Sequence, residues 1–160
     1  METVQIEPLS EERREWARQS LLQHWGDTRM VRRGQMVDAD GLPGFVALVD
    51  GEPVGLVTYQ IVGDACEILT IHSLRERRGV GSALIAAVKR VAQQRQCRCL
   101  WLVTTNDNLP ALRFYQKRGF YLTALRCNAM EATRRLKPQV PLLGLDGIPL
   151  RDELELEMSL

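Results

Sequence analysis

The chain has 160 residues, of which 45% are hydrophobic and 26% are charged. That length predicts one globular domain over residues 1–160, and the composition is ordinary for a soluble protein. The 21 Lys and Arg residues nearly balance the 20 Asp and Glu residues, so the net charge is +1. This balance argues against a dedicated nucleic-acid or membrane-surface binder, because such proteins carry a strong positive excess. The sequence also contains no apolar run of the roughly 20 residues that span a bilayer.

The cysteine spacing indicates the compartment. The four cysteines are Cys66, Cys97, Cys99 and Cys127. They show neither the paired C-x-x-C spacing of a zinc site nor the density of a disulfide framework. The N-terminus is too acidic and too weakly apolar for a secretory signal. We therefore expect a reduced cytoplasmic protein without a bound metal, whose cysteines are mostly small buried side chains.

The first half of the chain predicts a helix and an antiparallel meander. A helix is expected from Ser10, as its N-cap, to about Trp25, with Trp16, Ala17 and Leu21 facing inward. Residues 26–43 are polar and Gly-interrupted, which predicts a loop or a short irregular helix. An Asp50-Gly51 pair is a strong hairpin signal between two apolar runs. Strands are expected at Thr3–Glu7, Phe45–Val49, Val54–Val62 and Cys66–His72.

The second half alternates helices with strands. Helical periodicity covers residues 80–95, and Pro110 begins a second helix that ends at Lys117, with Gly119 as its cap. A basic helical patch around residues 134–137 and a turn-rich segment, 138–149, precede the last strand. The strands are expected at Leu100–Thr104, Tyr121–Arg126 and Glu153–Met158, the last with Leu154, Leu156 and Met158 inward. The order predicts an α/β fold: a mixed sheet of about six to seven strands, flanked by helices, with a central strand–helix–strand crossover.

Residues 68–84, ILTIHSLRERRGVGSAL, have the composition of an anion cradle. A strand leads through an arginine-rich turn to Gly79 and Gly81, where a helix begins at once. Glycines let the backbone approach a ligand closely, and the first helical N–H groups and the helix dipole favour negative charge. The alternative is a tight turn with solvated arginines. The third glycine of a dinucleotide-binding fingerprint and the lysine of a P-loop are both missing.

Residues 108–120, NLPALRFYQKRGF, form a second candidate segment directly after the Leu100–Thr104 strand. Ala111 and Tyr115 are four residues apart and share one helix face. Asn108 lies at the helix entrance, where its amide either caps the helix or holds a ligand amide. The alternative is a purely structural segment, with Tyr115 in the core and Gly119-Phe120 as cap and packing.

Together, the two segments resemble the GNAT superfamily of N-acetyltransferases. Leu69-Thr70-Ile71 followed by Glu76-Arg77-Arg78-Gly79-Val80-Gly81 is similar to that family's acetyl-CoA motif, a strand followed by [RQ]-x-x-G-x-[GA] and a helix. Asn108, Ala111, Tyr115, Gly119 and Phe120 match its N-x-x-A-x-x-x-Y-x-x-x-G-F segment. The resemblance implies a GNAT-like sheet with splayed central strands and acetyl-CoA (coenzyme A) as the cofactor. Glu76 departs from the usual Arg or Gln, and a carboxylate beside a diphosphate is expected to disfavour cofactor binding.

The resemblance also implies residue roles. The pantetheine would pair with the backbone near Ile71 and Ser73, and the pyrophosphate would bind N–H groups of residues 78–82. Tyr115 would protonate the leaving thiolate, unless it is a packing aromatic. Glu67 is the candidate base for the amine, unless it is a solvated edge carboxylate; His72 is an alternative, expected on the opposite face. The implied cofactor-binding set is Ile71, His72, Ser73, Arg77, Arg78, Gly79, Val80, Gly81, Ser82, Asn108, Ala111 and Tyr115.

The acceptor is less defined than the cofactor. The resemblance implies an acceptor groove built from residues 23–38 and 126–152, with Trp25, Arg29 and Arg32 as candidate substrate-binding residues. The expected reaction is acetyl transfer to a primary amine on a small molecule or a peptide, by direct attack on the thioester. The alternative is a non-catalytic acyl-CoA sensor with the same fold. Three roles stay open for residues 126–151: a lid, a subunit contact in a homodimer, or a solvated loop.

Overall fold

The computed structural model describes residues 3–74 and 79–160. Arg77 and Arg78, two of the predicted cofactor-binding residues, lie outside the described residues, as do Arg75 and Glu76. The described chain forms two compact units. The first unit comprises the described residues among 1–30, 38–100 and 160, and the second comprises residues 31–37 and 101–159.

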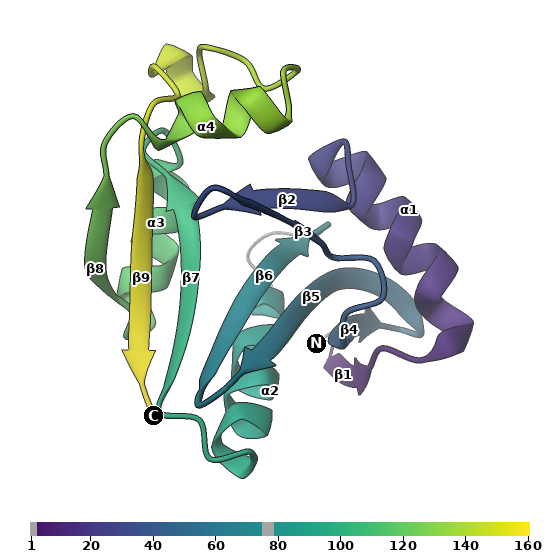
Figure 1. Cartoon of the computed structure of the whole chain (residues 1–160). Helices are drawn as coiled ribbons and strands as arrows, with labels where there is room; N and C mark the ends of the chain where they lie inside the picture. The colour runs from purple at the N-terminus through teal and green to yellow at the C-terminus, as the bar shows by residue number, and fades with distance from the viewer. Residues whose placement is uncertain (1–2, 75–78) are drawn as a thin grey trace. The chain divides into compact units, whose positions relative to one another are not determined.

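The elements alternate along the chain much as the sequence predicts (Figure 1). The strands are β1 (Val4–Pro8), β2 (Arg29–Arg32), β3 (Gln35–Asp38), β4 (Gly44–Val49), β5 (Glu52–Val62), β6 (Ala65–Ser73), β7 (Cys99–Thr105), β8 (Tyr121–Arg126) and β9 (Glu153–Ser159). The α-helices are α1 (Arg14–Trp25), α2 (Val80–Gln94), α3 (Leu109–Lys117) and α4 (Ala129–Leu136), and short 3-10 helices cover Glu11–Arg13 and Leu145–Gly147. None of the helices in these two described ranges is long and apolar enough to cross a membrane.

The first unit contains the predicted meander. Its strands lie in the order β1-β4-β5-β6, and each adjacent pair is antiparallel. Asp50 and Gly51, which join β4 to β5, both have positive φ, at 51° and 78°. A two-residue hairpin turn of this kind needs both residues in that region, which Gly adopts without cost and Asp tolerates. The hairpin prediction is therefore confirmed.

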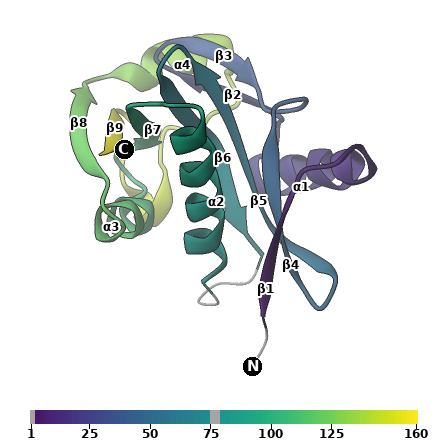
Figure 2. The same ribbon diagram turned by 90° about the horizontal axis from the view of Figure 1, so that it is seen from below.

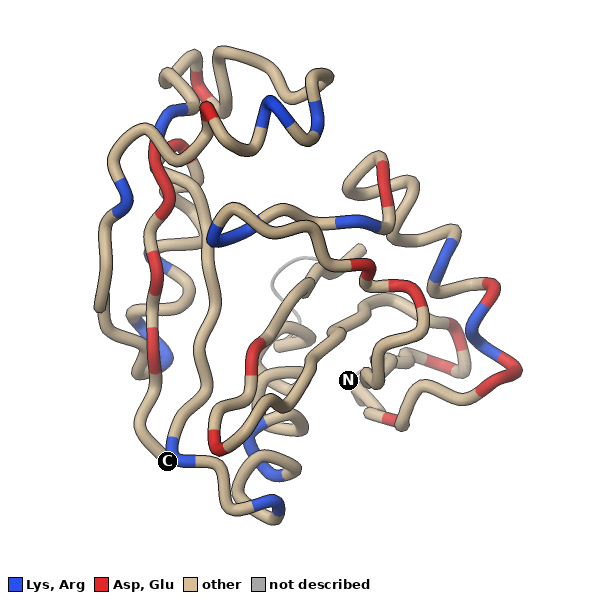
Figure 3. The backbone as a smooth tube through the Cα atoms, in the orientation of Figure 1, with Lys and Arg blue, Asp and Glu red and all other residues tan. Residues whose placement is uncertain are grey.

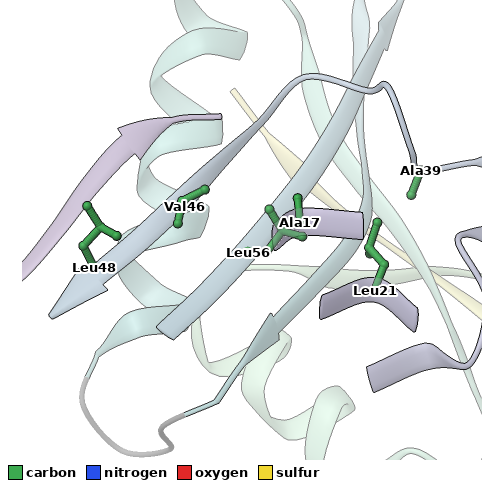
Figure 4. Packing of buried hydrophobic residues seen from close by; sticks show 6 residues of the cluster. All are labelled: Ala17, Leu21, Ala39, Val46, Leu48 and Leu56. Atoms are coloured by element: carbon green, nitrogen blue, oxygen red, sulfur yellow. The ribbon is translucent and has the colours of Figure 1, made fainter. Parts of the chain in front are cut away.

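Two helices cover opposite faces of this four-stranded part of the sheet. Ala17 and Leu21 of α1 pack with Leu56 of β5 in one buried cluster, whose members are labelled in Figure 4. The preceding residue on β5, Gly55, faces the opposite side of the sheet, where it lies against Val80 and Leu84 of α2. Figure 2 shows α2 running along this side of the sheet. The inward positions predicted for α1 are confirmed, since Ala17 and Leu21 are buried and Trp16 packs on the same cluster.

Gly55 allows α2 to approach the sheet closely. A Cβ atom at Gly55 would lie 2.7 Å from Val80 Cγ1 and 3.2 Å from the carbonyl oxygen of His72. The beginning of α2 and the end of β6 therefore both approach Gly55 closely, which is possible because this residue has no side chain. Since these are the two segments predicted to hold the cofactor, Gly55 sets the distance between them.

We expect Gly55→Ala to lower the free energy of unfolding by about 1–3 kcal/mol, because the added methyl group overpacks a closed contact. Urea unfolding measures the change. In a double-mutant cycle, Val80→Ala removes the clashing Cγ1, so the loss in the double variant is expected to be smaller than the sum of the two single losses. Additive losses would contradict the close packing of β5 on α2.

A β-bulge in the β5–β6 pair changes which residues share a face. Thr58 pairs with Thr70, but the next residue, Tyr59, pairs with Ile68, so β6 contains one extra residue. Glu67 consequently pairs with Gln60 and His72 pairs with Leu56. Gln60 and Leu56 lie four positions apart on β5 and share the α1 face. The expectation that His72 and Glu67 lie on opposite faces is wrong, because regular alternation was assumed across a bulge.

The second unit contains three strands in the order β7-β9-β8, with β8 and β9 antiparallel. Together with the four strands of the first unit, this agrees with the predicted mixed α/β fold of six to seven strands. The splay of the central strands stays a prediction. In α3, Pro110 stands in the first turn and Gly119, with φ at 98°, follows the helix, as expected.

The segment before β9 is held by polar side chains. Asn106 donates to the carbonyl oxygen of Pro149 at 2.9 Å and accepts from the N–H groups of Arg151 and Asp152. Asp107 is buried and accepts from Thr105 Oγ1 and from the N–H of Leu145 at 2.9 Å. Gly144 packs directly on the Asp107 side chain. The turn-rich segment predicted at residues 138–149 is thus a tethered structure and not a solvated loop.

Two other expectations are wrong. Residues 26–43 contain a two-stranded sheet, β2 and β3, turned by Arg33 and Gly34, which both have positive φ. The last strand does not simply alternate, because Glu153 and Glu155 are buried together with Leu156 and Met158. For Glu155 the stabilising partner comes from a remote part of the sequence, because Arg33 donates to its carboxylate.

Candidate functional site

The N-terminus of α2 has the geometry of an anion site. Gly79, its N-cap, is in the left-handed region with φ at 71°, and a Cβ atom there would have nothing within 4 Å. No acidic residue lies in the first turn. Val80 is buried, whereas Gly81 is partly exposed. Because N–H groups in the first turn have no acceptor within the helix, this end of α2 presents donors and a positive dipole to a ligand.

The end of β6 lies beside this helix terminus. Ile71 and Ser73 pair with Val57 and Gly55 of β5 and therefore share the face that α2 covers. Both residues are partly buried. The structure thus brings together the predicted positions Ile71, His72 and Ser73 with Gly79, Val80, Gly81 and Ser82 at one end of the first unit.

His72 points to the α1 face and is almost completely buried, at 5% exposure. Its Nε2 shares a 2.6 Å hydrogen bond with the hydroxyl of Ser20 on α1. Its ring stacks on that of His24, with the centroids 4.5 Å apart and the planes at 13°. Burial, with a smaller contribution from His24, lowers the pKa of His72 from 6.5 to about 4. The imidazole is therefore neutral near pH 7.

The lowered pKa of His72 predicts a pH-dependent stability. The unfolded chain binds a proton at this position below its ordinary pKa of 6.5, and the folded chain only below about 4. The stabilisation is present above the unfolded pKa and is lost as the pH falls toward the folded value. We expect the free energy of unfolding to drop by about 2 kcal/mol more in the parent than in His72→Gln between about pH 7 and about pH 5. Urea titrations of both proteins measure this difference, and equal slopes would contradict it.

Glu67 is also buried, at 3% exposure. Its Oε1 accepts a 2.8 Å hydrogen bond from Gln60 Nε2, the residue opposite it on β5. The alternative of a solvated edge carboxylate is therefore wrong. Between Glu67 and His72, the hydroxyls of Thr58 and Thr70 share a buried 2.6 Å hydrogen bond. With the bond between His72 and Ser20, three hydrogen-bonded polar pairs thus follow one another along the α1 face of β5 and β6.

In the second unit, α3 positions the other predicted motif. The Asn108 side chain accepts from the N–H of Ala111 at 3.2 Å, so it caps the helix. The Tyr115 ring makes edge contacts with Phe114 and Phe120, at centroid distances of 5.4 and 5.6 Å. Burial raises the pKa of Tyr115, so its hydroxyl stays protonated across the neutral range.

The predicted acceptor residues are divided between the units. Trp25 is 42% exposed and packs its edge on His24, and Arg29 forms an ion pair with Asp27 at 3.2 Å, all in the first unit. Arg32 belongs to the second unit, where its guanidinium lies 5.8 Å from the ring centroid of Trp101.

The sequence reasoning missed a charge cluster in the second unit, in which two buried glutamates of β9 meet two more exposed arginines. Arg33 stacks on Trp101 at 3.7 Å and donates to Glu155 at 2.8 Å. Arg126 also donates to Glu155, at 2.9 Å, and lies 3.7 Å from Glu153. β9 carries acidic residues along its length in Figure 3. Burial raises the pKa of Glu153, whereas for Glu155 the opposing effect of burial is outweighed by the two arginines, which lower its pKa. Two glutamates at buried positions of β9 were the only sequence feature that could have indicated this cluster, and they were expected to face outward.

Comparisons with known proteins agree with this geometry. A family model described as "Acetyltransferase (GNAT) family" matches residues 9–120. The uncharacterized protein YxbD of Bacillus subtilis is 44% identical over 138 residues, covering 86% of this chain and 87% of the relative. An aminoglycoside N(6')-acetyltransferase type 1 of Salmonella typhimurium is 29% identical over 109 residues, covering 61% and 74%. A GNAT family acetyltransferase from Elizabethkingia anophelis, solved with acetyl-CoA bound, superposes with a TM-score of 0.70 at 19% identity, covering 98% of each chain.

Proposed function

The chain belongs to the GNAT family of acetyltransferases, and on that premise we propose that it transfers the acetyl group of acetyl-CoA to a primary amine. The observation that carries the proposal is the meeting of the α2 N-terminus with the end of β6 over Gly55. A ligand with a diphosphate in its middle and an extended amide arm matches a helix terminus beside a strand end. We further propose that residues 1–160 act as one catalytic domain, and that the reaction is cytoplasmic, as four free cysteines favour.

Each part of the cofactor has a proposed partner. The pyrophosphate binds the N–H groups at the beginning of α2, from Gly79 to Ser82, with Arg77 and Arg78 adding positive charge. The amides of the pantetheine pair with backbone groups of Ile71 and Ser73. Asn108 and Ala111 are also proposed to contact the cofactor. A backbone N–H near Ile71 polarises the thioester carbonyl as a one-donor oxyanion site.

The reaction needs proton transfers at both ends. An alkyl ammonium has a pKa near about 10, so the acceptor must lose a proton before its nitrogen attacks. Glu67, acting through water, is the proposed base for this step. The nitrogen then forms a bond to the carbonyl carbon and loses its second proton, the C–S bond breaks, and the thiolate takes a proton from Tyr115, which regains one from water. The products are the acetylated amine and coenzyme A with its thiol restored, and a proton is released to water.

The proposed acceptor is a small-molecule or peptide amine. The Salmonella relative is named for an aminoglycoside, which is a small polyamine, and this similarity favours the same broad class here. Trp25, Arg29 and Arg32 are proposed to contact the acceptor. Because the described chain also places buried carboxylates on β9, charge by itself does not select between cationic and anionic acceptors.

A panel of amines scored by release of free thiol from acetyl-CoA tests the proposal. It should contain aminoglycosides, polyamines, aryl alkyl amines and short peptides with a free N-terminus or lysine. Thiol release that depends on one acceptor class, with the acetylated amine identified by mass spectrometry, is the expected result. Calorimetric binding of acetyl-CoA without thiol release from any amine would favour the acyl-CoA sensor, and absence of binding would overturn both functions.

A further inference from the structure

His72 has a ring nitrogen that the fold leaves without a partner. The side chain is 95% buried, since its exposure is 5%. Nε2 is bonded to Ser20, but Nδ1 is buried and has no hydrogen-bond partner in the described part of the chain. Buried polar atoms are almost always satisfied, by protein or by water, so an exception in a native fold needs an explanation.

The ring that carries this nitrogen is fixed from two directions. Ser20 holds Nε2 at 2.6 Å, and His24, also on α1, stacks on the ring at 4.5 Å. The partner of His72 on β5 is Leu56, which offers no polar group. Nδ1 therefore points in a set direction, as a group must if it is to meet a reacting atom.

The position of His72 along β6 links it to chemistry. It lies between Ile71 and Ser73, the two residues whose backbone is proposed to hold the acyl arm, but its side chain is on the α1 face, away from α2. Glu67 shares that face, but its partner Gln60 lies four residues along β5 from Leu56. Four residues of strand span about 13 Å, so one atom cannot contact both side chains. His72 is the nearer of the two to the proposed acyl position.

We propose that His72 is a further catalytic residue, whose Nδ1 accepts a proton from the acceptor nitrogen, and that Ser20 is its positioning residue. This inference rests on the proposed acetyl transfer. When Nε2–H donates to Ser20 Oγ, Nδ1 carries a lone pair and accepts a proton. Because the imidazole is neutral near pH 7, the lone pair is available without prior deprotonation.

The proton in question is the second one that the amine loses. The free amine attacks the thioester carbonyl, and the new C–N bond leaves a positive charge on the nitrogen. That N–H is far more acidic than the starting ammonium, so a weak base suffices. Nδ1 takes this proton, the C–S bond breaks as the carbonyl re-forms, and Tyr115 supplies the proton to the thiolate. The imidazolium then returns its proton to water, and Tyr115 regains one from water, so both residues are restored.

The test compares His72→Ala with Cys66→Ala, which also truncates a buried side chain of β6. We expect His72→Ala to lower kcat by about 100-fold with unchanged acetyl-CoA affinity, as loss of a general base does. Added imidazole should restore about fivefold or more of the lost rate, since it can occupy the vacated volume. Cys66→Ala should stay within about twofold of the parent and gain nothing from imidazole. Ser20→Ala should lower kcat by about three- to tenfold, and it keeps the test available if His72→Ala does not fold.

Two outcomes overturn the inference. One is a folded His72→Ala protein that keeps kcat within about threefold of the parent. The other is a loss of rate that imidazole does not restore and that Ser20→Ala does not share, which indicates a structural role only. A parent protein that binds acetyl-CoA but releases no thiol with any amine overturns the proposed function itself, so the two failures are distinguished by the parent assay.

Discussion

Gly81→Glu is expected to weaken acetyl-CoA binding by at least about 100-fold while the protein stays folded. The substitution places a carboxylate in the first turn of α2, which is free of acidic residues in the parent. Acidic side chains at this position stabilise a helix through its dipole, so folding should not suffer. A diphosphate at the same terminus is repelled instead, and two like charges about 4 Å apart near a protein surface interact by about 4 kcal/mol.

Isothermal titration calorimetry measures the loss, and Ala86→Glu is the matched control. Ala86 is an exposed position of the same helix, so this variant adds the same charge away from the terminus. It should bind acetyl-CoA within about threefold of the parent. Equal affinities in all three proteins would show that the diphosphate does not bind at the beginning of α2.

Tyr115→Phe is expected to lower kcat by about 100-fold with the acetyl-CoA affinity unchanged within about threefold. The hydroxyl is the proposed proton donor to the leaving thiolate, and its raised pKa keeps it protonated near neutral pH. The ring contacts with Phe114 and Phe120 do not involve the hydroxyl and should persist. Thiol release under saturating acceptor, together with a binding titration, separates the two effects.

Tyr121→Phe makes the same chemical change on a tyrosine with no proposed role. The Tyr121 hydroxyl bonds to Ser159 at 2.9 Å on an exposed part of β8 and β9. Its loss should leave kcat within about twofold of the parent. Should both phenylalanine variants behave alike, Tyr115 is a packing residue and another group protonates the thiolate.

The hairpin turn after β4 and the ends of α2 and α3 were correctly predicted, because these features are determined by residues close together in the sequence. Gly79 at the beginning of α2 and the Asp50-Gly51 turn follow from backbone conformations that few other residues adopt. Asn108 was expected either to cap α3 or to hold a ligand amide, and it makes the capping bond. In each case the residues that determine the structure lie within a few positions of one another, so a single sequence is sufficient to reveal them.

The features that the sequence reasoning missed depend on remote partners. The pairing of Ser20 with His72 joins residues 52 apart, and Arg33 reaches Glu155 across 122 positions. Buried glutamates on β9 are unexpected until their arginines are known, because an unpaired charge is costly to bury. The four-residue strands β2 and β3 are too short for periodicity to identify. The extra residue in β6 inverts every later position, which alternation cannot foresee.

The backbone conformation of residues 138–152 is held by hydrogen bonds that do not involve the exposed side chains of the segment. Asn106 and Asp107 hold it through backbone groups, and so does Arg134, which donates to the carbonyl oxygens of Pro141 and Leu150. The outward side chains Leu142, Leu143 and Leu145 take no part in these bonds and are 73%, 60% and 49% exposed. These three leucines can therefore be substituted without loss of the hydrogen bonds that hold the segment to the turn before α3.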